Sequence, residues 1–256
     1  MGKEHRLEER RQEIIGAVGK VGKLSVVELS RRFDVSEVTI RQDLQELHDQ
    51  GFLLRTRGGA VSSNKMPEMS FDMRKQQHAA EKARIGKSAA TLVNPGDTIF
   101  MDASTTVHAM IPHLKKIHEL TVITNSLRVA LFFLDSPQIQ VILPGGHLRR
   151  ESISLVGLTS DSPVPSINIQ IGFFGARGLT VEEGLTDVNI NEVALKQKFI
   201  TSCRQVVAML DAGKWGKVAA YTFAGLPQID AIFSDRNAPK DLAALIEKNQ
   251  IEVNLV

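Results

Sequence analysis

Apolar side chains recur at helical spacing in three segments near the start of the chain. Residues 6–18 (RLEERRQEIIGAV) place four apolar side chains on one stripe among charges, which predicts a first helix. Residues 24–33 (LSVVELSRRF) predict a short second helix, because Ser25 and Glu28 have the spacing of a capping box. Residues 34–51 predict a third helix, with a serine at its start and a glycine just past its end.

A glycine-containing pair of short extended segments follows the third helix. Residues 51–61 (GFLLRTRGGAV) indicate a β-hairpin in which Gly58 and Gly59 can take the turn conformation. Together with the tight turn FDVS between the second and third helices, this hairpin predicts a winged helix-turn-helix.

Polar side chains off the apolar stripe of the third helix could hydrogen-bond base edges or phosphates. Arginines on the hairpin would lie beside the DNA backbone or the minor groove. The DNA-binding candidates are Ser36, Glu37, Thr39, Arg41, Gln42, Gln45, Arg55 and Arg57. The alternative is a three-helix module whose polar face is merely solvated, and the arginine-bearing hairpin makes it the weaker interpretation.

The rest of the chain alternates short β-branched runs with helical segments, which predicts an α/β domain with a mainly parallel sheet. Residues 62–75 contain Ser, Asn and Pro with no steady period and are interpreted as a linker. The expected organisation is a winged helix-turn-helix domain at 1–61, this linker, and an α/β domain at 76–256. The expected strands are 98–102, 121–125, 139–146, 169–176, 205–212, 228–235 and 251–256.

Nearly every expected strand is followed by polar residues or glycines. Ligands of such sheets bind at the carboxyl ends of the strands. Hydroxyls, amides and cations from five strand ends would suit a sugar that carries a phosphate. These candidates are Asp102, Ser104, Thr105, Thr106, Asn125, Ser126, Arg149, Arg177 and Lys214. Each one alone could instead be a turn residue or a surface charge, and Ser104 or Thr105 could simply cap the next helix.

Composition narrows the class of protein without naming a function. The chain has 256 residues, 43% of them hydrophobic and 23% charged, and a formal net charge of +2, as expected of an ordinary globular protein. Its single cysteine, Cys203, excludes a disulfide framework and a cysteine-based zinc site within one chain. Without a signal-peptide-like or membrane-spanning segment, we expect a cytoplasmic protein with no metal site, cofactor or membrane partner.

The string VSEVTIRQDLQELHDQG, with RRQEII ahead of it and RTRGGA behind, resembles the DNA-binding signature of the DeoR family of bacterial repressors of sugar metabolism. The distinguishing residues are Ser36, Thr39, Ile40, Arg41, Asp43 and Leu44. The second half resembles the effector domain of the same family, which is similar in fold to ribose 5-phosphate isomerase and to CoA transferases. The resemblance implies operator DNA and a phosphorylated sugar as partners.

The family resemblance also implies site residues. Its hydroxyl loop falls on residues 102–106, where Ser104 replaces the usual glycine. Its further motifs fall on Gly145, Gly146, Arg149, Asn191, Glu192, Lys196, Asp211 and Lys214. Arg177 departs from the pattern, because the family has an aspartate there. This arginine could favour a more negatively charged ligand, or it could pair with Glu182, Glu183 or Asp187 and never touch ligand.

An isomerase of this fold needs a carboxylate base beside the sugar's carbonyl. Gln197 stands at the position that aligns with that base, and a glutamine cannot abstract the proton. We therefore expect a site that binds without turnover, in a DNA-binding regulator that forms a homo-oligomer on a repeated operator. The alternatives are a sugar-phosphate isomerase-like enzyme with a DNA-binding extension and a pure interaction module.

Overall fold

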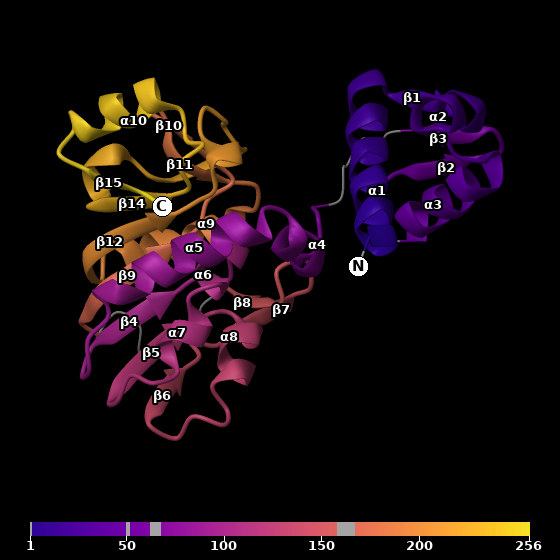
Figure 1. Cartoon of the computed structure of the whole chain (residues 1–256). Helices are drawn as coiled ribbons and strands as arrows, with labels where there is room; N and C mark the ends of the chain where they lie inside the picture. Colours follow the sequence, from indigo (N-terminus) through magenta and orange to yellow (C-terminus); the bar gives the residue numbers. More distant parts are fainter. Residues whose placement is uncertain (1, 50–51, 62–67, 158–166) are drawn as a thin grey trace. The chain divides into compact units, whose positions relative to one another are not determined.

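The computed structural model describes residues 2–49, 52–61, 68–157 and 167–256, and the chain divides into two compact units, Met1–Met69 and Ser70–Val256 (Figure 1). No described helix has the length and apolar character needed to cross a membrane.

The predicted linker at 62–75 differs from the structure in its last part. Residues 62–67 lie outside the described residues, but Phe71–Gln76 form helix α4 of the second unit. The Ser70 hydroxyl caps α4 by accepting a hydrogen bond from the Met73 N–H at 3.4 Å, and the Phe71 side chain is buried. Ser70, one of the serines that suggested a linker, therefore marks the start of a helix.

The first unit contains the three predicted helices and the predicted hairpin. Its elements are α1 (Gly2–Val21), β1 (Lys23–Ser25), α2 (Val26–Phe33), α3 (Glu37–Asp49), β2 (Leu54–Thr56) and β3 (Gly59–Val61). The capping box at the start of α2 is present, and the sequence did not predict β1, which pairs antiparallel with β3. Gly59 is needed here because a Cβ would come 2.1 Å from the Leu24 carbonyl oxygen, and neither glycine of the hairpin has a positive φ.

The second unit is built on a seven-stranded sheet in the order β15-β14-β12-β9-β4-β5-β6, in which every neighbouring pair is parallel. All seven strands predicted from the sequence are present. They are β4 (Thr98–Met101), β5 (Leu120–Thr124), β6 (Ile139–Ile142), β9 (Ile169–Phe174), β12 (Cys203–Met209), β14 (Ala231–Ser234) and β15 (Glu252–Leu255).

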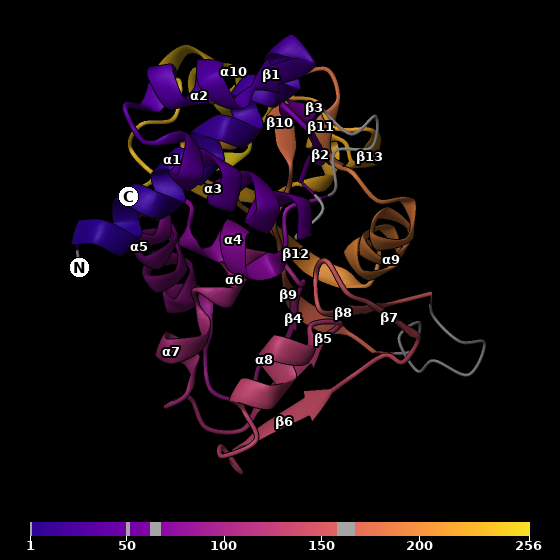
Figure 2. The same cartoon turned by 90° about the vertical axis from the view of Figure 1, so that its right-hand side faces the viewer.

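Helices cover both faces of this sheet (Figures 1 and 2). One buried cluster joins Phe100 and Phe174 of the strands to Phe199 of α9, and the other joins Met101 and Phe173 to α5–α8. Alternate side chains of each strand therefore supply the two cores. The helices are α5 (Ala79–Ala89), α6 (Thr105–His108), α7 (Ile111–Leu114), α8 (Leu127–Phe132), α9 (Ile190–Ile200) and α10 (Lys240–Glu247), with 3-10 turns at Ala90–Leu92, Ala212–Lys214 and Leu226–Gln228.

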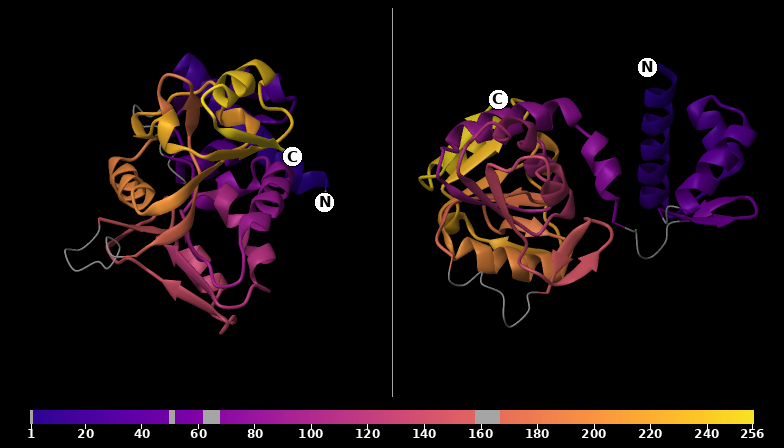
Figure 3. Two further views of the ribbon diagram at one scale, coloured as in Figure 1. Left: turned by 90° about the vertical axis from the view of Figure 1, so that its left-hand side faces the viewer. Right: turned by 90° about the horizontal axis from the view of Figure 1, so that it is seen from below.

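Two small antiparallel sheets of the second unit were not predicted (Figure 3). One pairs β7 (His147–Arg149) with β8 (Ser154–Val156), and the other consists of β10 (Gly178–Thr180), β11 (Gly184–Asp187) and β13 (Tyr221–Ala224). Of these strands, β7, β8 and β10 have three residues each, too few for a hydrophobic period to show.

Candidate effector site and DNA-contacting surface

Four neighbouring strands, β12, β9, β4 and β5, bring most of the predicted effector residues to one edge of the sheet. Because all four run parallel, the residues after their carboxyl ends lie side by side. The contact is close: a Cβ on Gly175, after β9, would lie 2.3 Å from the Ser104 side chain, after β4. Only glycine fits at Gly175 without displacing the hydroxyl loop.

A buried charge cluster lies at the centre of this edge. The Lys196 Nζ is 2.7 Å from Asp187 Oδ2 and 3.1 Å from Asp102 Oδ2, and it donates to the Gly175 carbonyl oxygen at 2.7 Å. Burial disfavours the ammonium form of Lys196, but the two carboxylates outweigh that effect and raise its pKa. Burial likewise opposes ionisation of Asp187, yet Lys196 holds its pKa below the usual value.

Asp102 is used by the fold itself. Its Oδ1 accepts from the Ser104 N–H at 2.9 Å, and its Oδ2 accepts from the Gly175 N–H at 2.8 Å. With Lys196 at the same carboxylate, Asp102 sets the shape of the hydroxyl loop. Asp102, predicted as an effector-site residue, is 1% exposed, and its contacts fix the loop that carries Thr105 and Thr106.

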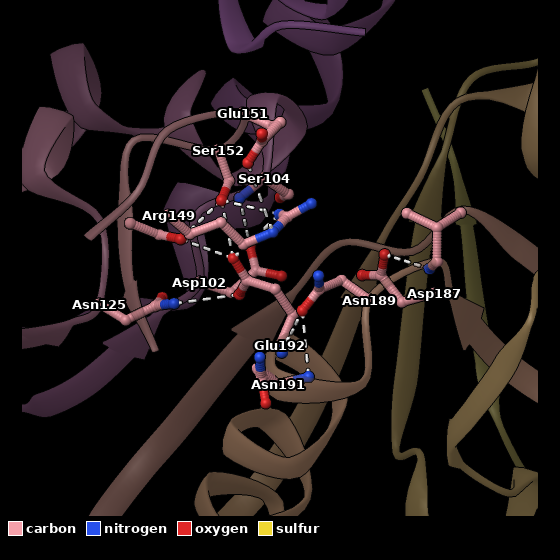
Figure 4. Close-up of polar contacts among 12 residues, drawn as sticks. Asp102, Ser104, Asn125, Arg149, Glu151, Ser152, Asp187, Asn189, Asn191 and Glu192 are labelled. Atoms are coloured by element: carbon pink, nitrogen blue, oxygen red, sulfur yellow. Dashed lines mark hydrogen bonds and ion pairs between the residues drawn. The ribbon is translucent and has the colours of Figure 1, made fainter. Parts of the chain in front are cut away.

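Glu192 is the centre of a second buried network (Figure 4). Its Oε1 accepts from Ser152 Oγ at 2.8 Å and from Ser154 Oγ at 2.5 Å, and it lies 3.4 Å from Arg149 Nη1. Its Oε2 accepts from Asn125 Nδ2 at 3.2 Å. Glu192 thus ties the β7–β8 hairpin to α9 and to the end of β5. The sequence indicated neither serine, because their partner is 38 or more positions away.

Three other predicted effector positions also serve local structure. Ser126 Oγ caps α8 by accepting from the Val129 N–H at 3.4 Å. Gly145 and Gly146 have φ of +83° and +117°, and a Cβ on Gly146 would lie 2.5 Å from the Val156 carbonyl oxygen. These glycines are needed for the close entry into the β7–β8 hairpin.

The three hydroxyl side chains of the hydroxyl loop have different roles. Ser104 caps α6 by accepting from the Val107 N–H at 3.2 Å, so the capping interpretation holds for this residue. The Thr105 and Thr106 side chains are each 6% exposed. Neither hydroxyl forms a hydrogen bond within the described part of the chain. Two nearly buried hydroxyls are therefore available to an added group.

Positive charge is concentrated at the same edge in four side chains, here called the cationic cluster: Arg74, Lys82, Arg177 and Lys214. The pKa of Lys82 is lowered to about 8, mainly by burial and also by Lys214, although Asp211 opposes the shift. Burial, followed by repulsion from Arg177, lowers the pKa of Arg74 to about 10. The sequence indicated neither Arg74 nor Lys82 as a site residue.

Two members of the cationic cluster were predicted, and their partners differ. Arg177 Nε lies 3.8 Å from Asp187 Oδ1, and Asp187 is one of the three carboxylates considered for it. Lys214 follows β12, and burial lowers its pKa. Among the described residues, Lys214 has no ion pair within 4 Å. A desolvated lysine that Asp211 influences without forming an ion pair is suited to bind an anion.

The predicted DNA-contacting side chains lie on α3 and the β2–β3 hairpin. Arg41 pairs with Glu37 at 2.7 Å and is about half exposed, while Gln42 and Arg57 are exposed. The Arg55 guanidinium donates to Gln45 Oε1, which joins the hairpin to the helix. The Ser36 hydroxyl accepts from the Thr39 N–H at 3.1 Å and lies 2.9 Å from the Thr39 hydroxyl.

The orientation of α3 depends on a buried carboxylate that was part of the sequence signature. Asp43, 1% exposed, accepts from Arg10 Nε at 2.7 Å and from Arg11 Nε at 3.0 Å, and so ties α3 to α1. Ile40, Leu44 and Leu47 are fully buried beside it. The exposed polar face of α3 is therefore presented by a fixed helix.

Two family models match the sequence: the DeoR-like helix-turn-helix domain at residues 10–66 and the DeoR C-terminal sensor domain at residues 77–236. The HTH-type transcriptional regulator GolR of Listeria innocua is 37% identical over 91% of this chain and 92% of its own. The glycerol-3-phosphate regulon repressor of Escherichia coli is 29% identical over 96% and 98%. A solved ribose 5-phosphate isomerase of Methanocaldococcus jannaschii shares 14% identity over 54% and 55%, with a TM-score of 0.41, a similarity that carries no inference about activity.

Proposed function

Because this chain belongs to the DeoR family of transcriptional regulators, we propose that it represses a carbohydrate-catabolism operon and leaves its operator when a phosphorylated sugar binds the second unit. The Escherichia coli relative is by name a repressor of the glycerol-3-phosphate regulon. Access to a bacterial chromosome requires a cytoplasmic protein. Recognition of paired half-sites requires a homo-oligomer, with a dimer as its smallest form.

The observation that carries the effector assignment is the cationic cluster beside the Thr105 and Thr106 hydroxyls. Four largely buried cations that repel one another favour a ligand that adds negative charge, although Asp187 and Asp211 already offset part of the repulsion. A phosphate monoester supplies about two negative charges and several acceptor oxygens. The buried Lys196 and Glu192 already have partners in the protein, so they support the shape of the site.

The isomerase alternative is not favoured. Gln197 is exposed on α9, where its Nε2 donates to the Thr222 carbonyl oxygen at 3.3 Å, and it cannot act as a base. The relatives that match across the whole chain are transcriptional regulators. We propose binding without turnover.

A thermal-shift panel tests the effector assignment directly. The full-length chain is heated with inorganic phosphate, glycerol 3-phosphate, pentose 5-phosphates and hexose 6-phosphates, with the unphosphorylated sugars as controls. A ligand that binds only the native state raises stability by RT ln(1 + [L]/Kd), about 2.7 kcal/mol at one hundred times Kd. We expect at least one phosphate ester to raise the Tm and to lower operator affinity. A panel in which no phosphate changes either quantity would overturn the proposal.

Lys214→Ala and Thr105→Val should weaken ligand binding without weakening operator binding. Each substitution removes a charge-assisted hydrogen bond to phosphate, worth roughly 1.5–3 kcal/mol, so ligand Kd should rise tenfold or more. Lys217→Ala, which removes an exposed lysine near the same strand end, is the matched control and should leave Kd unchanged. Ligand titration of the Tm provides the measurement, and wild-type Kd in both variants would remove these residues from the site.

Arg41→Ala and Arg57→Ala should affect DNA binding in different ways. If Arg41 reads a base, its loss costs about 1–3 kcal/mol on the specific operator and little on other DNA. Loss of Arg57, on the hairpin, should weaken binding to all DNA and reduce the salt slope by about 1 per lost phosphate contact. Fluorescence anisotropy at several salt concentrations, on duplexes selected by the wild type from a random pool, distinguishes the two. Wild-type binding by both variants would show that the DNA-contacting surface lies elsewhere.

A further inference from the structure

Helix α4 is the first element of the second unit, and its contacts reach several parts of that unit. The Phe71 ring packs edge-on against His108 of α6, with ring centroids 5.3 Å apart. Asp72 pairs with Arg128 of α8 at 2.5 Å. Through these contacts α4 is attached both to the helix that follows the hydroxyl loop and to the helix that follows β5.

The carboxyl end of α4 is held by the cationic cluster itself. The Lys82 ammonium donates to the Gln77 carbonyl oxygen at 2.7 Å and to the Arg74 carbonyl oxygen. The Arg74 side chain donates from Nη2 to the Glu151 carbonyl oxygen at 3.3 Å, in the connection between β7 and β8. Arg74 is thus in contact with the hairpin that Glu192 ties to the site.

Arg74 and Lys82 therefore have two roles that depend on each other. Both belong to the cationic cluster, and both fix the position of α4 by hydrogen bonds to main-chain carbonyls. An anion that attracts these cations competes with those carbonyls for the same N–H donors. Moving either donor changes how α4 is held.

We propose that α4 passes occupancy of the effector site to the DNA-binding unit, with Arg74 contacting the bound anion and acting as the coupling residue. The inference rests on the proposed function and goes beyond it, since it names the element that carries the signal. In the sequence α4 follows within two residues of Met69, the last residue of the first unit, so a change in α4 acts at the junction of the two units. The ligand shifts operator affinity because it favours a placement of α4 that differs from the one held by the Arg74 and Lys82 hydrogen bonds.

The test measures coupling separately from ligand affinity. The probes are inorganic phosphate and the phosphate ester that most raises the wild-type Tm, each used at a concentration that saturates that variant's Tm shift. Operator Kd is measured with and without the probe for the wild type, Arg74→Ala, Arg74→Lys and Lys75→Ala. Lys75→Ala is the matched control, because it removes an exposed cation from the same helix.

We expect the wild type and Lys75→Ala to change operator Kd about 5- to 150-fold on ligand saturation. In Arg74→Ala the ratio of operator Kd with and without ligand should fall to near 1 at ligand saturation, whatever the ligand-free operator Kd of the variant. Arg74→Lys keeps the charge but loses the planar fork, so its ratio should be at least threefold below wild type. This second variant also decides the matter if Arg74→Ala does not fold.

The outcomes separate the two proposals. A wild-type coupling ratio in the saturated Arg74 variants would overturn the role of Arg74 while leaving the effector site intact. A wild type whose Tm and operator Kd respond to no phosphate would remove the proposed function and this inference together. Loss of coupling in Lys75→Ala as well would show that any charge on α4 has the same effect and would refute the specific contact.

Discussion

Lys196→Met is expected to lower the free energy of unfolding of the second unit by about 3–5 kcal/mol, because it leaves two buried carboxylates without their shared cation. Asp102 and Asp187 lie 3.1 and 2.7 Å from the Lys196 ammonium. The chain's single tryptophan, Trp215, is buried in the second unit, where its Nε1 donates to Ser234 Oγ at 2.9 Å. Urea unfolding followed by tryptophan fluorescence therefore reports the second unit.

The pH dependence of this loss has a definite sign. In the wild type, the pKa of Asp187 is lowered, so its stabilisation is present above the unfolded pKa of about 3.9 and is lost as pH falls through the folded value. The pKa of Lys196 is raised, so its stabilisation is present below about 10.4 and is lost only as pH rises through the folded value. Without Lys196, burial of the Asp187 carboxyl favours its protonated form. The difference between variant and wild type should therefore shrink from pH 8 to pH 5.

Lys198→Met is the matched control for this prediction, because Lys198 is an exposed lysine of the same helix. Its effect should stay within about 0.5 kcal/mol. Equal stability losses in the two variants, or a Lys196→Met loss that does not depend on pH, would contradict a charge-based role for Lys196.

Sequence patterns predicted the parts of the fold in which each element carries its own signal. The seven sheet strands are runs of β-branched and aromatic residues, and α2 and α3 begin at Ser25 and Ser36, whose hydroxyls bind nearby N–H groups. The hydrophobic period could not show β7 or β8, which have three residues each. Their hairpin is nonetheless held to Glu192.

The candidate effector site also has parts that the sequence predicted and parts that it could not show. The spacing of strand ends placed Thr105 and Lys214 at one edge of the sheet, as expected for parallel strands. The spacing could not show that the Asp102 carboxylate is bound by Ser104, Gly175 and Lys196, because Gly175 and Lys196 come from distant segments. Arg74 was hidden for a different reason. In the sequence, an arginine among polar residues resembles a solvated linker residue. Its partial burial is visible only in the tertiary structure.

Asp43→Ala should lower the free energy of unfolding of the first unit about as much as Lys196→Met lowers that of the second. Asp43 accepts from Arg10 at 2.7 Å and from Arg11 at 3.0 Å, and the arginine side chains are only 17% and 18% exposed. Removing the carboxylate leaves two largely buried guanidinium groups without the anion that they share, at a cost of about 3–5 kcal/mol. Because the ion pairs join α1 to α3, operator binding should weaken even though Asp43 is too buried to touch DNA.

Glu37→Gln is the matched control for stability, since it breaks an ion pair on the same helix that is about half exposed. Glu37 and Arg41 have side-chain exposures of 43% and 48%, and exposed pairs of this kind contribute about 0.3–0.5 kcal/mol. Hydrogen exchange of the α1 and α3 amides in the full-length chain measures both variants without relying on Trp215. Rapid exchange throughout α3 in Asp43→Ala but not in Glu37→Gln would show that burial of the carboxylate, rather than charge on the helix, holds α3 in place. Equal exchange in the two variants would mean that apolar packing by Ile40, Leu44 and Leu47 fixes α3 without help from Asp43, and the weakened operator binding predicted for Asp43→Ala should then be absent.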